Sequence, residues 1–373
     1  MTDKTGIYIH VPFCLSKCHY CDFCSRTRAD EETKCLYVKR LCDEVRACGE
    51  GLGEKRPTAD TVYFGGGTPT LLSPVQFSSI LDTVNEVFGI DSNAEITAET
   101  NPKSADSKKL CDMRALGINR LSIGMQSVHD NELKALGRIH NHADFLATFS
   151  DARRAGFDNI SADLMYGIPL QTRESFAESI KALVTLSPEH ISSYCLTVEE
   201  GTNFGRRRDS LVLPDEDTVS DMYRDMTELL GESGYEKYEI SNFAHNGQVS
   251  RHNLKYWKRE SYFGFGPAAH SFFGGVRFAN SRDVESYLNG DDIREYSEMI
   301  TGDGAIDEYV MLGMRLREGI DINEFNRLFG IDFMTRYGNT FKRFAPEYIS
   351  IDKNRCAFTD KGMFVSNYIL SET

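Results

Sequence analysis

Short apolar runs and amphipathic stretches alternate along the first half of the chain. The runs predict buried strands, and the stretches whose apolar residues recur three and four positions apart predict helices. Six strands are predicted, at residues 7–11, 61–64, 95–99, 120–124, 159–165 and 190–198. The predicted helices lie between them, at 31–49, 75–88, 105–116, 142–155 and 175–186. This α/β alternation predicts a parallel sheet, either open and doubly wound or an incomplete (β/α) barrel, with ligands at the carboxyl ends of its strands.

The remaining part of the chain has a different pattern. A helix is predicted at 215–234, and 235–244 suggests one more strand, before a stretch at 250–273 that is dense in aromatics and glycine. From about residue 305, short helices at 308–317, 322–329 and 332–344, a hairpin at 348–359 and a terminal helix at 361–370 predict a smaller α+β domain of winged-helix-like shape. The chain therefore divides into predicted segments 1–235, 236–304 and 305–373.

Charge and cysteine content narrow the class of protein. The formal net charge of −14 argues against a nucleic-acid surface. The C-terminal segment has no basic stripe, so a lid or interaction module is the better interpretation of it. Ten cysteines in 373 residues do not make a disulfide scaffold, and no N-terminal segment is typical of secretion, so reduced thiols in a cytoplasmic compartment are expected. No apolar run reaches 18 residues, so no membrane-spanning helix is predicted.

Three cysteines follow the first predicted strand at the spacing C-x3-C-x2-C: Cys14, Cys18 and Cys21. An iron–sulfur cube has four irons and is usually held by four thiolates, so a local set of three leaves one iron with the open position that a catalytic metal site needs. Two other interpretations remain. A zinc site would take His19 or Cys24 as a fourth ligand, and unrelated core cysteines would need no metal.

Glycines and a carboxylate follow the second and third predicted strands, where a ligand is expected. Gly65, Gly66 and Gly67 come directly after residues 61–64, and a missing Cβ lets a ligand approach the backbone, although such a run is more often a turn. Glu99 ends the third strand and can accept hydrogen bonds from an ammonium or a ribose, although a solvated acidic residue is commoner. Neither signal identifies a site alone.

The run YIHVPFCLSKCHYC resembles the signature of radical S-adenosylmethionine (SAM) proteins. Its flanks resemble the subgroup that contains oxygen-independent coproporphyrinogen III oxidases (HemN) and haem chaperones (HemW). The similarity continues through FGGGTPT, AETNP, IGMQS, LGRIHN and SADLMYGIP, and it implies an incomplete (β/α)6 barrel with a HemN-type C-terminal domain. In that superfamily three cysteines, here Cys14, Cys18 and Cys21, hold a [4Fe-4S] cube whose fourth iron binds the amino and carboxylate groups of SAM. The residues that the resemblance places around SAM are Tyr8, Tyr20, Gly66, Gly67, Thr68, Glu99, Gln126, Arg138 and Asp163.

Two details separate the members of this subgroup. The oxidase pattern continues as C-x3-C-x2-C-x-C, but Phe23 stands at its fourth cysteine position and Cys24 comes one residue later. The run HNLKYW, from His252 to Trp257, matches the H-N-x-x-Y-W pattern of the haem chaperones, which the oxidases lack. His252 offers an imidazole to iron, and Tyr256 and Trp257 offer flat apolar faces to a porphyrin.

The resemblance implies a cytoplasmic radical SAM protein that binds haem and delivers it to haem-requiring respiratory proteins, touching a membrane surface during delivery. Arg251 and Lys255 would meet the propionates, and His270 and His245 are weaker candidates for the iron, although a single histidine among aromatics is more often structural. An electron donor is implied, and its identity stays open. One alternative is a true enzyme, a coproporphyrinogen III oxidase that decarboxylates two propionates by radical chemistry. Another is a zinc-stapled binding module without SAM chemistry.

Overall fold

One curved sheet forms the centre of the computed structural model, which describes residues 4–373, so the first three residues of the predicted segment 1–235 lie outside it. The sheet has twelve strands in the order β14-β13-β12-β11-β1-β4-β5-β6-β7-β8-β10-β9. Its six predicted strands are present and mutually parallel: β1 (Lys4–Val11), β4 (Thr58–Gly66), β5 (Ile90–Thr100), β6 (Arg120–Gln126), β7 (Ile160–Tyr166) and β8 (His190–Cys195). Strand β8 ends at Cys195, earlier than the predicted residue 198.

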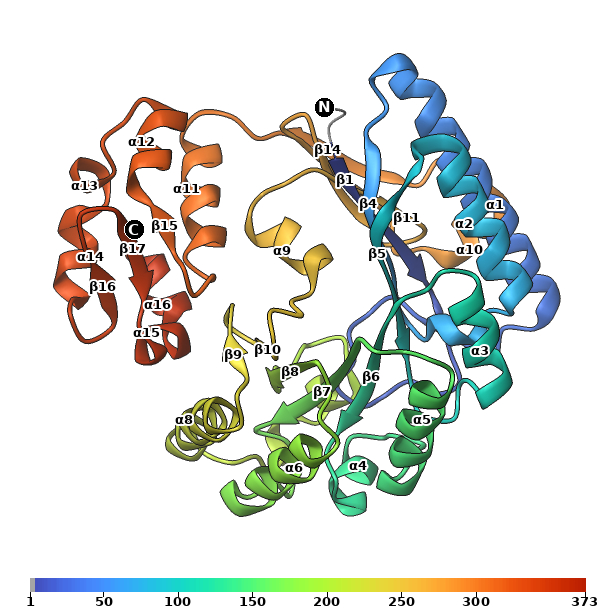
Figure 1. Ribbon diagram of the computed structural model, residues 1–373, viewed down its shortest axis with the longest axis horizontal. Coiled ribbons are helices and arrows are strands. Elements are labelled where there is room, and N and C mark those ends of the chain that lie inside the picture. The colour runs from blue at the N-terminus through green and yellow to red at the C-terminus, as the bar shows by residue number, and fades with distance from the viewer. Residues whose placement is uncertain (1–3) are drawn as a thin grey trace.

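Helices cover the outer face of these strands, along the convex side of the sheet in Figure 1. Three of the helices begin with a capping box, in which Ser73, Asn141 or Thr172 exchanges hydrogen bonds with the residue three positions later. The helices of this layer are α1 (Glu31–Leu52), α2 (Pro74–Phe88), α3 (Ser107–Ala115), α4 (Asp130–Ala135), α5 (His142–Arg154), α6 (Arg173–Thr185) and α8 (Glu216–Glu232). The result is the expected incomplete (β/α)6 barrel.

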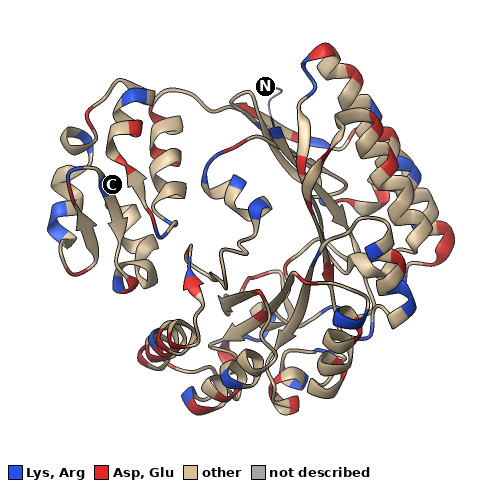
Figure 2. Cartoon of the chain, in the orientation of Figure 1, with Lys and Arg blue, Asp and Glu red and all other residues tan. Residues whose placement is uncertain are grey.

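Alternate side chains of the parallel strands have different surroundings. On β6, Leu121, Ile123 and Met125 are fully buried, whereas Arg120 and Ser122 line a cavity on the inner face of the barrel. Figure 2 shows most Lys, Arg, Asp and Glu residues on the outer helices and on the C-terminal domain. Charged side chains on the inner face are therefore exceptions that need an explanation.

The predicted middle segment completes the sheet on both sides. Beyond β8 it adds β10 (Asn242–Ala244) and β9 (Glu236–Lys237), where one strand was expected. On the other side β11 (Tyr262–Phe265) pairs in parallel with β1, which the sequence pattern did not predict. Three antiparallel strands extend this edge: β12 (His270–Phe273), β13 (Val276–Asn280) and β14 (Arg294–Met299). Helix α9 (Arg251–Trp257) lies in the opening of the barrel in Figure 1.

The C-terminal domain lies across this opening from the barrel (Figure 1). Its helices are α11 (Gly302–Gly313), α12 (Ile322–Phe329), α13 (Phe333–Arg336), α14 (Gly338–Phe344), α15 (Asp360–Phe364) and α16 (Ser366–Ser371). The helix predicted at 332–344 is thus divided in two, as is the terminal one. The predicted hairpin is present as β16 (Ile349–Ile351) and β17 (Arg355–Phe358), to which β15 (Ile320–Asp321) adds a third strand.

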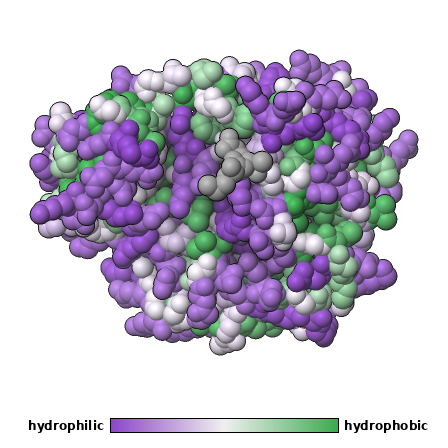
Figure 3. Space-filling model, turned by 45° about the horizontal axis from the view of Figure 1, so that its top comes forward, coloured by the Kyte–Doolittle hydropathy of each residue, from purple (hydrophilic) through white to green (hydrophobic). Residues whose placement is uncertain are grey.

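The outer surface is mostly polar. The face drawn in Figure 3 is largely hydrophilic, with apolar areas scattered over it. Among residues 4–373, no helix is long and apolar enough to cross a membrane.

Candidate functional site

A cavity of about 1060 Å³ opens at the carboxyl ends of the parallel strands. Its wall is formed by the cysteine loop, by the inner faces of the six strands and by residues of β11 to β14 and α9. Four of the residues expected around SAM from the strand ends, namely Gly66, Glu99, Gln126 and Asp163, line it together. The edge of the sheet at which the sequence pattern placed the ligands is therefore hollow.

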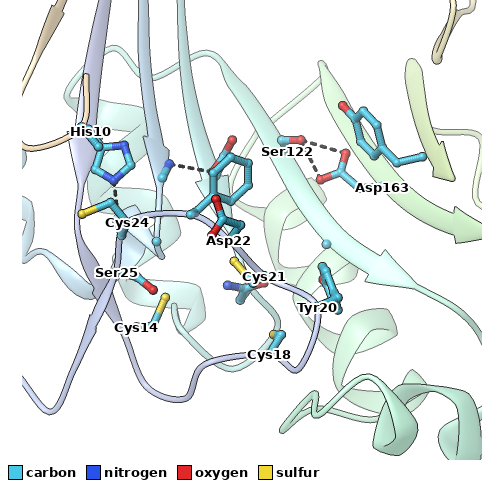
Figure 4. A pocket seen from close by; sticks show the side chains of 18 of the residues that line it. His10, Cys14, Cys18, Tyr20, Cys21, Asp22, Cys24, Ser25, Ser122 and Asp163 are labelled. Atoms are coloured by element: carbon cyan, nitrogen blue, oxygen red, sulfur yellow. Dashed lines mark hydrogen bonds between the residues drawn. The ribbon is translucent and has the colours of Figure 1, made fainter. Parts of the chain in front are cut away.

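The cysteine loop crosses one side of this cavity, with Cys14, Cys18 and Cys21 on the cavity wall (Figure 4). Backbone hydrogen bonds hold both ends of the loop. The Gly67 amide donates to the Val11 carbonyl at 2.8 Å, and the Arg26 amide donates to the Pro12 carbonyl at 2.7 Å. Because these bonds need no metal, the loop is positioned by the chain itself.

The donor set of the loop fits an iron–sulfur cube. Among the described residues, no group of three or more His, Cys, Asp or Glu side chains is arranged to hold a single metal ion. A cube has a wider requirement, since each of three irons takes its own thiolate at a different corner. Burial raises the pKa of the Cys21 thiol to about 11, so cluster binding would release protons from the loop. Three cysteines on one cavity wall would hold the cube and leave its fourth iron facing the cavity.

Two of the three glycines at the end of β4 are required by close packing. A Cβ on Gly66, which has a φ of 103°, would lie 2.6 Å from the His10 ring, and a Cβ on Gly67 would lie 2.5 Å from the Phe13 carbonyl oxygen. Both glycines line the cavity, but Thr68 does not. The Thr68 hydroxyl lies 3.7 Å from the Cys14 sulfur, behind the loop. The glycines therefore set the distance between the cysteine loop and the sheet.

Glu99 and Asp163 place two partly buried carboxyl groups inside the barrel. Glu99 accepts hydrogen bonds from the Tyr63 hydroxyl at 3.0 Å and from the Gly66 amide at 3.2 Å. Burial, and then the charge of Asp163, raise the pKa of Glu99 to about 7. Asp163 accepts from the Ser122 hydroxyl (Figure 4), and burial raises its pKa as well. A cationic or hydroxyl-bearing ligand would favour the ionised form of both groups.

Arg138 joins the strand ends to the cysteine loop. One of its guanidinium nitrogens, Nη2, donates to the Asn101 side chain at 2.9 Å and to the Gly124 carbonyl at 3.0 Å, and the other, Nη1, lies 3.4 Å from the Cys18 sulfur. Its buried Nε has no partner among the described residues. Gln126 lies beside it at the end of β6, with a φ of 68°. Arg138 thus has a donor free for a carboxylate next to the cluster loop.

Tyr8 and Tyr20 both line the cavity, Tyr8 from strand β1 and Tyr20 from the cysteine loop. The Tyr8 hydroxyl shares a hydrogen bond of 3.1 Å with Nδ1 of His10, and its ring stacks on Tyr63. Tyr20 comes between Cys18 and Cys21 in the sequence and lies to one side of them in Figure 4. Burial raises the pKa of both phenols, so both are neutral at physiological pH.

Helix α9 carries the HNLKYW run but separates its aromatic residues. Tyr256 lines the cavity, whereas Trp257 packs against the C-terminal domain with the Arg315 guanidinium 5.7 Å from its ring centre. His252 is 1 % exposed, and its two ring nitrogens share hydrogen bonds with the Thr61 hydroxyl at 2.8 Å and the Tyr256 hydroxyl at 2.7 Å. Burial lowers the pKa of His252 to about 3, so the ring is neutral. In this conformation neither ring nitrogen of His252 is free for a ligand.

The other haem candidates have different surroundings. Lys255 forms a buried ion pair with Asp60 at 2.9 Å, away from the cavity wall. His245 lines a separate small pocket. His270 lines the main cavity, and among the described residues only its Nδ1 has a partner, the Tyr296 hydroxyl at 3.2 Å. His270 is therefore the exposed imidazole among these candidates.

Sequence reasoning missed a buried charged residue of the cavity, Arg120. Arg120 begins β6 and lines the cavity although it is 2 % exposed. The signal that was available is a charged residue inside an otherwise apolar strand, since arginine is rarely buried without a partner.

Comparisons with known proteins agree with this architecture. Residues 8–183 match the model of the radical SAM superfamily, and residues 300–365 match that of the HemN C-terminal domain. The solved structure of coproporphyrinogen III oxidase (HemN) from Escherichia coli superposes with a TM-score of 0.86 at 23 % identity, covering 100 % of this chain and 90 % of the other. Together with the cysteine loop, these matches define a radical SAM protein, a class that uses a [4Fe-4S] cluster and SAM.

Full-length relatives identify the group within that class. The chain is 34 % identical to the Bacillus subtilis protein named heme chaperone HemW, over 97 % of both chains. It is 35 % identical to the HemW of Mycobacterium tuberculosis, over 85 % of this chain and 83 % of that one. A mouse mitochondrial protein, radical S-adenosyl methionine domain-containing protein 1, is 38 % identical over 72 % of this chain and 61 % of its own length. The chain belongs to the HemW family.

Proposed function

We propose that this protein binds haem and delivers it to haem-requiring acceptor proteins. The observation that carries the proposal is the identity of 34 % with a heme chaperone over 97 % of both chains, which leaves no large part of either without a counterpart. The HNLKYW run and a cavity of about 1060 Å³, large enough for a second ligand beside SAM, support it. The acceptors and the electron donor are proposed only as classes.

We further propose that Cys14, Cys18 and Cys21 hold the cluster. Replacing any of the three by Ala should remove the brown chromophore and most of the iron from anaerobically reconstituted protein. Cys195→Ala is the matched control, because its thiol lines the same cavity but lies outside the loop. A full cube in all three loop variants, or its loss in Cys195→Ala, would contradict the assignment.

The SAM site is proposed at the residues that the family resemblance named. The segment with Gly66, Gly67 and Thr68 would receive the methionyl ammonium. Glu99, Gln126 and Asp163 would surround the rest of SAM, and the free donor of Arg138 would take the carboxylate. Arg138→Lys should weaken SAM binding, because a lysine lacks the planar donor fork. Unchanged affinity in titration calorimetry would place the carboxylate elsewhere.

The haem iron has two proposed imidazole ligands that one experiment separates. His252 is the prediction from the HNLKYW run, but its coordination requires the hydrogen bond to Tyr256 to break. His270 needs no such change, because its Nε2 has no partner among the described residues. Haem should be titrated into His252→Ala and His270→Ala. The variant with the shifted Soret band identifies the ligand.

The decisive test of the function is a paired anaerobic assay on reconstituted protein. Saturable, stoichiometric haem binding without conversion of coproporphyrinogen III in the presence of SAM and a reductant is expected. Phe23, at the position of the fourth oxidase cysteine, supports this expectation. Formation of protoporphyrinogen would instead establish a coproporphyrinogen III oxidase and overturn the proposal.

A further inference from the structure

Arg120 is a buried cation without a partner. Its side chain lies on the inner face of β6, is 2 % exposed and lines the main cavity. Among residues 4–373, no group forms a hydrogen bond or an ion pair with its guanidinium, and its Nε is buried and unpaired. Arginine presents five donors and stays charged at every physiological pH. A guanidinium buried in this way costs the fold free energy unless something compensates its charge.

The groups around Arg120 balance its charge only at longer range. The charge of Arg120 acts to lower the pKa of Glu99 and of Asp163, but neither carboxylate bonds to it. Glu99 and Asp163 line the same cavity, but their hydrogen bonds come from other residues and neither lies within ion-pair distance of Arg120. His190, in the adjacent part of the barrel, uses both ring nitrogens for Ser161 and Tyr238. The guanidinium therefore faces a cavity rather than a partner in the chain.

Arg120 lies far from Gln126 and Arg138, although its charge acts on Glu99 and Asp163 of the proposed SAM site. Arg120 is the first residue of β6, and Gln126, in the SAM site, is the last. At about 3.3 Å per residue, the two Cα atoms lie about 20 Å apart along the strand. Arg138, the arginine beside the cysteine loop, lies at the Gln126 end, where its Nη2 binds the Gly124 carbonyl. An anion at Arg120 would thus belong to a molecule that reaches the inner end of the cavity.

We propose that Arg120 binds a carboxylate at the inner end of the cavity. A carboxylate matches the planar donor fork of arginine and accepts two parallel hydrogen bonds from it. The inference rests on the proposed function, under which the carboxylate is a propionate of haem. The alternative source of the same chemistry is the methionyl carboxylate of SAM.

The test pairs a change in the protein with a change in the ligand. Haem and its dimethyl ester, which lacks both carboxylates, should be titrated into the cluster-loaded, SAM-bound protein and into Arg120→Met, with Soret absorbance as the readout. Haem affinity should fall by about tenfold or more in Arg120→Met, as for loss of a charged hydrogen bond, whereas the affinity for the ester should stay within about twofold. Arg120→Lys keeps the charge without the planar donor fork, so its affinity for haem should lie between those of Arg120→Met and of the unaltered protein.

A second arginine of the same cavity provides the matched control. Arg282 lines the cavity but already pairs with Asp22 at 3.1 Å. Arg282→Met should therefore change haem affinity much less than Arg120→Met. An ester-sensitive loss in Arg282→Met with none in Arg120→Met would overturn the proposal and place the propionate at the rim.

The other outcomes are equally definite. If Arg120→Met loses affinity equally for haem and for the ester, Arg120 has a packing role only. If it loses affinity for SAM instead, Arg120 binds the SAM carboxylate. Either result overturns the propionate assignment while the haem-chaperone proposal stands. Failure of the unaltered protein to bind haem would overturn both.

Discussion

The partly buried carboxyl group of Glu99 gives a quantitative test of the electrostatics inside the barrel. Burial and the charge of Asp163 raise its pKa from 4.5 to about 7. Between these two values the unfolded chain has lost this proton and the folded chain has kept it. The free energy of unfolding therefore falls as the pH rises from 4.5 to about 7, and the full cost is present above that range.

Glu99→Gln keeps the size of the side chain and removes its titration. A shift of about 2.5 pKa units corresponds to about 3 kcal/mol. Part of this cost is already present at pH 5. The free energy of unfolding of Glu99→Gln relative to that of the unaltered protein should therefore rise by about 2–3 kcal/mol between pH 5 and pH 8. Urea unfolding of metal-free protein at the two pH values, followed by the fluorescence of the single tryptophan, Trp257, measures the gain.

Asp163→Asn tests the second cause of the pKa shift. Removing this neighbouring charge should lower the pKa of Glu99. Glu99→Gln should therefore raise the free energy of unfolding by less in the Asp163→Asn background than in the unaltered protein. Unfolding free energies of the unaltered protein and Glu99→Gln that change in parallel with pH would refute the reasoning.

Two further variants test the packing around the site. Gly124→Ala should weaken SAM binding by about tenfold or more, because the new Cβ would lie 2.5 Å from Nη2 of Arg138; calorimetry that finds unchanged affinity would remove Arg138 from the site. His252→Ala should lower the free energy of unfolding by about 2 kcal/mol or more without haem, since the hydroxyls of Thr61 and Tyr256 lose their partner, and a variant as stable as the unaltered protein would deny the imidazole a structural role. The pKa of His252, about 3, lies below its usual 6.5, so the unfolded chain binds this proton first and acidification below 6.5 destabilises the fold. Urea midpoints at pH 7 and pH 5 should show that His252→Ala lacks this part of the acid sensitivity.

The parallel strands could be predicted from the sequence because each is a local apolar run that ends at glycine or a polar residue. The strand β11 could not be predicted in this way. Its residues, Tyr262–Phe265, lie in a stretch of aromatics and glycine without periodicity, and its pairing with β1 joins parts of the chain that are far apart in sequence. Short runs whose neighbours are distant carry no local signal of their partner.

The candidate site was predictable as far as strand ends and motif spacing allow. The roles of the residues within HNLKYW were harder to predict. His252 and Tyr256 are four residues apart on one helix and contact each other, which occupies one ring nitrogen of His252. That spacing was visible in the sequence, whereas the contact of His252 with Thr61, which fixes its second nitrogen, depends on the packing of α9 against β4. The burial of both ring nitrogens of His252 therefore depends on tertiary packing and could not be predicted from the local sequence.

The pairing of β1 with β11 also has a consequence for biosynthesis. The strand that leads into the cysteine loop has one neighbour, β4, close behind it in the chain, and the other, β11, about 250 residues later. On the ribosome, β1 therefore remains an unpaired sheet edge until residue 265 has been made. The Gly6 amide, which donates to Ser261, waits for the same event. Chains that stop before this point would therefore expose β1 as an unpaired sheet edge that can pair with other chains.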